Sequence, residues 1–213
     1  MNFQTLWPDL SREVQQLLQS ESQILNFKRG NSIYSQGDRP KGLYVVQSGL
    51  VGLTIVSASS GKEHLLRFFR EKEFFGHRAL FSEEEYHGSA VALELTDILF
   101  ISRSIVLAAI EKDKSLLRYV VHTLARELRQ AENQRVMILE NEIKVRVAQA
   151  LIYLKDLHPD HNWTRLEIAN FCASTTSTVI KALAELEAEG YISQQGRVIT
   201  VVDRAALIDL QAQ

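Results

Sequence analysis

The 213-residue sequence contains one cysteine, Cys172. A single cysteine excludes an intrachain disulfide, a zinc site built from several cysteines and an iron–sulfur cluster held by four cysteines of the chain. The apolar residues around Cys172 predict a buried helix residue rather than a redox sensor. The sequence also lacks 18 uninterrupted apolar residues and a basic leader before an apolar run. We therefore expect a soluble, cytoplasmic protein with no membrane partner.

Neither sign of charge dominates, because 24 lysines and arginines face 26 aspartates and glutamates, a formal net charge of -2. Binding to nucleic acid must therefore depend on a local patch. The 46% hydrophobic content is enough for one large or two small cores. No Ser–His–Asp spacing, phosphate-cradling loop or cluster of metal ligands stands out, so we expect no catalytic site, no metal site and no enzyme.

Eight of the ten glycines lie between Gly30 and Gly88, where they separate short apolar runs. This pattern is typical of a β-domain, and short, evenly spaced strands favour a compact barrel or jelly roll. A short helix capped by Ser11 precedes the domain, and another, from Ser102 to Ile110, follows it. The expected strands are Leu43–Val46, Leu50–Val56, Leu65–Phe69 and Val91–Leu95, with a hairpin turn at Ser59–Lys62.

Residues 113–141 form the longest helix that the sequence predicts, roughly 40 Å at 1.5 Å per residue, with Asp113 as its N-cap. Apolar side chains recur along it at steps of three, four or seven, which is typical of a helix that pairs with another helix. Leu116 and Val120 widen this seam near its start. The alternative is an ordinary core helix of one all-helical domain. The expected homodimer interface consists of Leu117, Val121, Leu124, Leu128, Ala131 and Ile138.

The remaining residues predict a second unit whose elements follow the order helix, tight turn, helix and hairpin. That order is typical of a winged helix-turn-helix. The elements are a helix from Ile143 that ends before Pro159, a short helix capped by Thr164, a tight connection at Cys172–Ser174, a helix over 175–189 followed by the capping Gly190, and a hairpin with its turn at 194–197.

A helix-turn-helix reads DNA with the N-terminal part of its second helix, where side chains reach base edges in the major groove. Thr175–Thr178 occupy that end and Lys181 lies one turn on, whereas the buried stripe begins at Val179. Four consecutive hydroxyl residues exceed what capping needs, and hydroxyls bond bases or phosphates while threonine methyls touch thymine. The residues expected at double-stranded DNA are Thr175, Thr176, Ser177, Thr178 and Lys181, with Arg165 and Arg197 toward the backbone.

The charge of the second unit favours a different interpretation. From Glu142 onward there are seven basic residues and nine acidic ones, which is a poor balance for a DNA-binding domain. A signalling module, in which the β-domain binds a ligand and the winged unit contacts a protein, is therefore an open alternative.

Four stretches together resemble the CRP/FNR family, that of the cAMP receptor protein and the fumarate–nitrate reductase regulator, over essentially the whole chain. They are Gly30–Asp38, Leu43–Gly49, Phe75–Phe81 and Thr164–Ala169. The resemblance implies an α+β fold with a cyclic-nucleotide-binding-like β-roll at 1–112, a dimerisation helix at 113–141 and a winged helix-turn-helix at 142–213.

The resemblance also implies a homodimeric transcription regulator. Its β-roll would sense an effector, and its two winged domains would bind operator half-sites roughly 34 Å apart, with RNA polymerase as a further partner. Arg165 matches a phosphate-contacting position of the family, and Gly196 with Arg197 matches the tip of the wing. The family's Arg-Glu-x-x-x-Arg reading set falls on Thr176, Ser177 and Lys181, so we do not expect the familiar operator sequence.

An effector pocket is implied as well, but it departs from cAMP-binding members. His77 stands in place of the glutamate that holds the ribose, Gly88 in place of the arginine that clamps the cyclic phosphate, and Ala131–Glu132 in place of the pair that touches adenine. We therefore expect an unknown small organic effector, or none, rather than cAMP. Haem ligation by His77, as in a gas sensor, is an alternative cofactor. The candidate pocket residues are Gly76, His77, Arg78, Ala79, Ser89, Ala90, Leu128 and Ala131.

Overall fold

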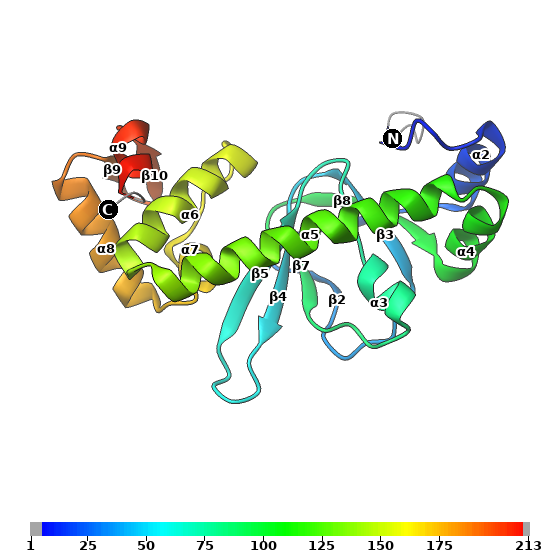
Figure 1. The fold of residues 1–213 in the computed structure, drawn as a ribbon, viewed down its shortest axis with the longest axis horizontal. Helices are drawn as coiled ribbons and strands as arrows, with labels where there is room; N and C mark the ends of the chain where they lie inside the picture. The colour runs from blue at the N-terminus through cyan, green and yellow to red at the C-terminus, as the bar shows by residue number, and fades with distance from the viewer. Residues whose placement is uncertain (1–5, 211–213) are drawn as a thin grey trace. The chain divides into compact units, whose positions relative to one another are not determined.

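The computed structural model describes residues 6–210, so the outermost ends of the expected domains, residues 1–5 and 211–213, lie outside the described part (Figure 1). The expected α+β fold is confirmed, since strands and short helices precede one long helix, and a helix-turn-helix with a hairpin follows it. The residues divide into two compact units: the first comprises residues up to 61 and residues 66–129, and the second comprises residues 62–65 and those from 130 onward, so one boundary falls inside the long helix. Within residues 6–210, no helix has the length and apolar character needed to span a membrane.

Two four-stranded sheets, with strand orders β1-β8-β3-β6 and β2-β7-β4-β5, belong to the first unit apart from the start of β5. Their strands are β1 (Gln23–Phe27), β2 (Ser32–Tyr34), β3 (Gly42–Ser48), β4 (Val51–Val56), β5 (Glu63–Phe69), β6 (Phe74–Phe75), β7 (Ser89–Ala92) and β8 (Thr96–Ser102).

Residues 42–46 of β3 are all buried. Because successive side chains of a strand point to opposite sides, both faces of β3 must be covered. Tyr44 and Val46 pack in a core cluster with residues of both sheets, such as Phe75. Leu43 and Val45 pack on the other side in a cluster with the helices. Those helices are α2 (Arg12–Glu21), α4 (Arg103–Lys112) and the first turns of α5 (Ser115–Glu140). A short helix, α3 (His77–Ser82), follows β6.

The expected strands that match β3, β4 and β5 are confirmed, but the strand expected at Val91–Leu95 is misplaced. The chain forms β7 up to Ala92 and then a strand that the sequence analysis missed, β8 from Thr96. Strand β8 pairs with both β1 and β3. Its run Ile98–Ile101 is uninterrupted and apolar, which is typical of a strand covered on both faces and gives no alternation to recognise.

The prediction that Asp113 is the N-cap of the long helix is wrong, because Asp113 ends α4 and α5 begins two residues later, but its side chain still contacts the first turn of α5. The Asp113 carboxylate accepts hydrogen bonds from the backbone N–H groups of Ser115, at 2.9 Å, and Ser11, at 2.7 Å. These two bonds lower the pKa of Asp113. The same residue therefore links the first turn of α5 to the start of α2.

The second unit has the expected order of helix, tight turn, helix and hairpin, followed by an additional short helix. Its elements are α6 (Ile143–Leu157), α7 (Arg165–Phe171), α8 (Thr176–Ala188), β9 (Ile192–Gln195), β10 (Val198–Val201) and α9 (Arg204–Asp209). The turn between α7 and α8 places Ala173 at a φ of 51°, and Gly190 caps α8 at a φ of 79°. The sequence predicted a four-residue turn at 194–197. In the structure Gln195 pairs with Val198, so the turn consists of Gly196 and Arg197 alone.

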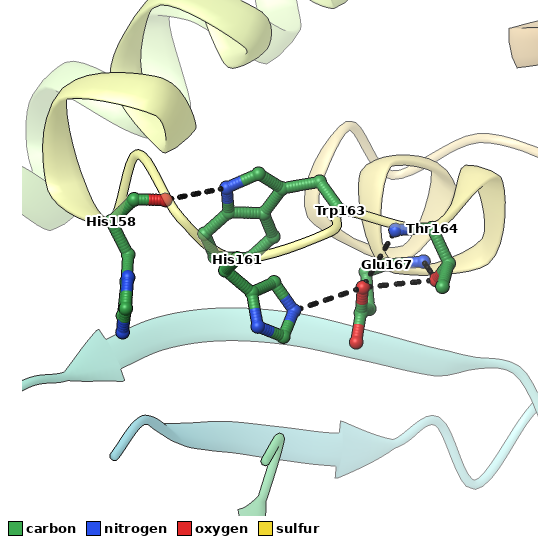
Figure 2. A network of polar contacts seen from close by, with 5 residues as sticks. All are labelled: His158, His161, Trp163, Thr164 and Glu167. Atoms are coloured by element: carbon green, nitrogen blue, oxygen red, sulfur yellow. Dashed lines mark hydrogen bonds and ion pairs between the residues drawn. The ribbon is translucent and has the colours of Figure 1, made fainter. Parts of the chain in front are cut away.

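A capping box holds the first turn of α7 (Figure 2). The Thr164 hydroxyl accepts the backbone N–H of Glu167 at 3.1 Å, and the Glu167 carboxylate accepts the backbone N–H of Thr164 at 2.8 Å. His161 contacts the same carboxylate at 3.4 Å. Burial would raise the pKa of Glu167, but the contacts with His161 and Thr164 outweigh it and lower the pKa. The start of the helix that carries Arg165 is therefore fixed by side chains on both sides of Thr164.

Replacing Thr164 by alanine should lower the free energy of unfolding by about 1 kcal/mol, because the N-cap acceptor is lost. Thr164→Ser keeps the hydroxyl and should stay near the wild type. Urea unfolding followed by circular dichroism measures the difference. Equal stability of the alanine and serine variants would show that the capping box contributes little.

Candidate nucleic-acid interface and effector cavity

The N-terminal hydroxyls of α8 are engaged mainly with one another. Thr175 caps the helix by accepting the backbone N–H of Thr178 at 3.2 Å. Its hydroxyl also lies 3.0 Å from that of Ser177 and 2.7 Å from that of Thr178. The hydroxyls of Thr175, Ser177 and Thr178 are thus engaged at the cap, which is more than the sequence indicated. Fewer of them are free to form hydrogen bonds with DNA.

The outward face of α8 contains one residue that the sequence analysis did not consider. Ser177 and Lys181 are exposed as expected, and Thr176 is half-buried. Between them lies Ile180, whose surface is 51% exposed. The inward face is formed by Val179, Ala182, Leu183 and Leu186. The i, i+4 spacing from Thr176 would have placed Ile180 on the outward face.

Arg165 joins α7 to the wing, a contact that the sequence analysis did not predict. Its guanidinium donates to the carbonyl oxygen of Arg197 at 2.9 Å and to the side-chain oxygen of Gln194 at 2.8 Å. Gln194 is in turn held by Glu187 of α8, at 2.6 Å to its backbone N–H. Gly196 and Arg197 are exposed at the hairpin turn. Arg165 therefore orients the wing in addition to its expected role near the phosphate backbone.

Cys172 is fully buried at the end of α7, as expected. Burial raises the pKa of its thiol to about 12. A thiol with such a pKa carries almost no thiolate at neutral pH, and the thiolate is the reactive form. The cysteine therefore serves packing rather than redox chemistry.

A cavity of about 430 Å³ lies in the first unit among strands, α3 and α5. The aromatic residues Tyr34, Phe69 and Tyr86 line it, and Tyr34 and Tyr86 stack with ring centroids 3.6 Å apart. Polar groups of Arg67 and Glu127 lie in its wall. This volume and mixed lining are typical of a small-molecule site.

The structure places four of the eight candidate pocket residues on this cavity and four elsewhere. Gly76, His77, Arg78 and Ala79 line it. By contrast, Ala90 is buried in the core, Ser89 accepts the backbone N–H of Gln36 at 2.9 Å, and Leu128 and Ala131 are exposed on α5. The contribution of α5 to the cavity comes instead from Leu124 and Glu127, because the inward face of the helix is set by Leu116 and Val120.

Glu127 is a buried carboxylate that the sequence analysis missed. It forms an ion pair with Arg67 of β5, and its carboxylate lies 3.1 Å from Nε2 of His77 in α3. Arg67 also donates to the backbone carbonyl of Glu127 at 3.0 Å. Burial would raise the pKa of Glu127, but the hydrogen bond and charge of His77, followed by those of Arg67, lower it. Three elements around the cavity are therefore joined by one charge cluster.

The position that corresponds to the phosphate-clamping arginine of cAMP binders is sterically closed. A Cβ atom on Gly88 would lie 2.4 Å from the carbonyl oxygen of Thr54. This separation is shorter than any van der Waals contact, so the backbone would have to move before any side chain fits there. The neighbouring His77 is only 1% exposed.

The geometry of His77 does not favour haem ligation. Its Nε2 contacts Glu127, and its Nδ1 is buried without a hydrogen-bond partner among the described residues. An iron atom would have to displace Glu127 or reach a nitrogen that solvent does not reach. Elsewhere in residues 6–210, no group of three or more His, Cys, Asp or Glu side chains is arranged to hold a metal ion.

Helix α5 carries two apolar stripes rather than the single widened seam expected from the sequence. Leu116 and Val120 belong to the core of the first unit, and Leu124 packs against the same core. Leu117, Val121 and Leu128 are exposed by 38%, 57% and 62%. Ala131 is also exposed and Ile138 is half-buried. Leu116, Val120 and Leu124 therefore pack within their own unit, whereas Leu117, Val121 and Leu128 form a separate stripe that faces outward.

The Glu127 cluster predicts a specific loss of stability in acid. Because the folded state holds the pKa of Glu127 below its ordinary value of 4.5, unfolding takes up a proton as the pH falls below about 5. The contribution of the ionised Glu127 to the free energy of unfolding is complete above that pH range. It is lost as the pH falls through the pKa of Glu127 in the folded state. Glu127→Gln should flatten this acid decline in urea unfolding measured between pH 7 and pH 4, whereas Glu111→Gln, at an exposed site on α4, should not. An unchanged decline in Glu127→Gln would contradict the assignment.

Comparison with known proteins assigns both units to domain families. The family model of the cyclic nucleotide-binding domain matches residues 24–113, and that of the Crp-like helix-turn-helix domain matches residues 145–210. The chain is 32% identical over 211 residues to a cyclic AMP receptor protein of Thermus thermophilus, which covers 98% of this chain and 97% of the relative. It is 26% identical over 199 residues to a CRP-like cAMP-activated global transcriptional regulator of Mycobacterium tuberculosis, over 89% and 88% of the two chains.

A solved structure shows the same fold. It is a transcriptional regulator of the CRP/FNR family from Thermus thermophilus, with a TM-score of 0.77, 28% identity, and coverage of 90% of this chain and 99% of the other. The expected resemblance is thereby confirmed in sequence and in structure. With a relative 32% identical over nearly its full length, and with both domains present in order, the chain belongs to the CRP/FNR family of DNA-binding transcription regulators.

Proposed function

We propose that this regulator works as a homodimer that binds an operator of two half-sites and responds to a small organic effector in the cavity of its first unit. The observation that carries the DNA-binding part is the outward face of α8, with Thr176, Ser177 and Lys181 at the end that a helix-turn-helix inserts into the major groove. Arg165, Gly196 and Arg197 support contacts with the flanking backbone.

The outward stripe of α5 supports the dimer. Leu117, Val121 and Leu128 together form an exposed apolar row on a helix of 26 residues. Apolar side chains at such spacing on one helix are buried when a second copy packs against them. Two α5 helices paired in this way would bring two winged domains to one operator.

The cavity lining argues for an effector other than a cyclic nucleotide. The closed position at Gly88 leaves no room for a phosphate-clamping arginine, and His77 is committed to Glu127. The aromatic wall formed by Tyr34, Phe69 and Tyr86 suits a planar or apolar ligand body. Although two relatives are named for cAMP, the proposed effector here is a small molecule of mainly apolar character.

The alternative that the winged unit contacts a protein draws support from its charge. Seven basic residues face nine acidic ones from Glu142 onward, so long-range attraction to DNA is weak. Salt dependence separates the two possibilities, because DNA binding releases counterions and a protein contact of this composition has no comparable slope.

We expect the logarithm of DNA affinity to fall linearly with the logarithm of salt concentration. Lys181→Ala and Arg197→Ala should each reduce that slope by about two units in a dimer, because each subunit then neutralises one phosphate fewer. Lys155→Ala, on the helix before the reading elements, is the control and should leave the slope unchanged. Fluorescence anisotropy with a labelled operator gives the slopes. Identical slopes for all four proteins would refute the assigned surface.

Leu128→Glu should convert the dimer to monomers, because it places a charge in the stripe of both helices. Leu95→Glu is a matched control, since Leu95 is 72% exposed and lies outside α5. Leu124 is unsuitable as a test, because it packs within its own unit. Sedimentation velocity separates the two states. A tight dimer in Leu128→Glu would show that the copies meet elsewhere.

A further inference from the structure

Ile180 is a large apolar side chain in the middle of the face that reads DNA in the proposed function. It is 51% exposed on α8, although α8 buries its other large apolar residues, Val179, Leu183 and Leu186, against the unit. Its neighbours on the outward face are polar or small. Single exposed apolar residues are ordinary on protein surfaces, so the position of Ile180, rather than its exposure alone, carries the argument.

Helix geometry places Ile180 among the reading side chains. At roughly 100° per residue, Ile180 lies about 40° around the helix from Thr176 and about 60° from Ser177. Its Cα–Cβ bond tilts toward the N-terminus of α8, which is the end that enters the major groove. The isoleucine side chain therefore leans toward the turn that holds Thr176 and Ser177.

The polar groups nearby leave room for an apolar contact to decide specificity. The hydroxyls of Thr175, Ser177 and Thr178 are already linked at the cap. Lys181 is a donor suited to phosphate oxygens or to O6 and N7 of guanine, so it does not recognise thymine. In the major groove, an isoleucine side chain offers no hydrogen bond, and the base-edge feature that complements it is the C5-methyl group of thymine.

We propose that Ile180 packs against a thymine methyl group in each half-site and so specifies thymine at that position. The inference rests on the proposed binding of DNA through α8 and adds the chemical group that is read. It predicts that the half-site is recognised at this position by contact with a methyl group, whereas a recognition helix with charged side chains would use hydrogen bonds to base edges.

The test removes single methyl groups from the DNA. A binding site is first selected from a random library with the full-length protein, in the presence of the low-molecular-weight filtrate of its host's cells, so that the effector need not be known. Each thymine of the site is then replaced by deoxyuridine, which keeps base pairing and lacks only the methyl group. Affinities are compared for the wild type, Ile180→Ala and Ile180→Val. Ile208→Ala, at a 45% exposed isoleucine of α9, is the matched control.

Loss of one buried methyl group should weaken wild-type binding about fourfold per half-site, or about 15-fold when both half-sites carry deoxyuridine. One thymine position should show this loss in the wild type, in Ile180→Val and in Ile208→Ala. Ile180→Ala should bind thymine and deoxyuridine sites equally, because the side chain that contacts the methyl group is gone.

Two results would overturn the inference. The first is that, at the thymine whose replacement by deoxyuridine weakens wild-type binding, Ile180→Ala loses as much affinity as the wild type. A group other than Ile180 would then contact the methyl group. If no thymine replacement affects wild-type binding to its selected site, the surface reads no methyl. Failure of the wild type to select any sequence is a distinct outcome, because it would contradict the proposed DNA-binding function together with the inference.

Discussion

Glu127 keeps its charge although only 8% of its surface is exposed, which is possible because two cationic or hydrogen-bonding partners surround it. Arg67 comes from β5, His77 from α3, and Glu127 itself from α5. Removing the Glu127 carboxylate would take the ion pair from Arg67 and the partner from Nε2 of His77, so the cluster helps to fix where α5 lies on the sheets of its unit. It also defines the inner wall of the cavity, since all three residues line it. A ligand in the cavity would act directly on the contact that holds α5.

This arrangement connects the two halves of the proposed function through one helix. Leu124 and Glu127 face the cavity, whereas Val121 and Leu128 lie on the exposed stripe proposed for the dimer. These positions lie within two turns of one another on the same helix. In the proposed function, a ligand that moves the inward face would therefore change the packing of the outward face, and with it the spacing of the two winged domains.

Much of the fold was predictable because its signals are local. The caps at Ser11, Thr164 and Thr175 follow from residue type and spacing, and the helix-turn-helix follows from the order of its elements. The strand β8 was missed because it is buried on both faces and shows no alternation. Residues separated by 50 or 60 positions, such as His77 and Glu127 or Arg67 and Glu127, meet only in three dimensions. No local pattern could have paired them.

The candidate site likewise contains residues that the sequence could indicate and residues that only the packing reveals. Lys181, Arg197 and the glycine of the hairpin turn were proposed from motif position, because a winged helix-turn-helix places its reading elements at fixed points of the sequence. The pocket residues of α5 were placed one turn too far along, since periodicity alone does not say which of two apolar stripes faces the domain. Ile180 was overlooked because an apolar residue in a helix is first taken as part of the core.

The most direct test of the central claim is the symmetry of the DNA that the full-length protein selects from a random library in the presence of its host's small-molecule filtrate. A homodimer with paired α5 helices predicts an inverted repeat whose half-site centres lie about 10 base pairs apart, one turn of the double helix. Enrichment of a single unrepeated half-site, or of no sequence at all, would contradict a dimeric regulator that reads DNA through α8.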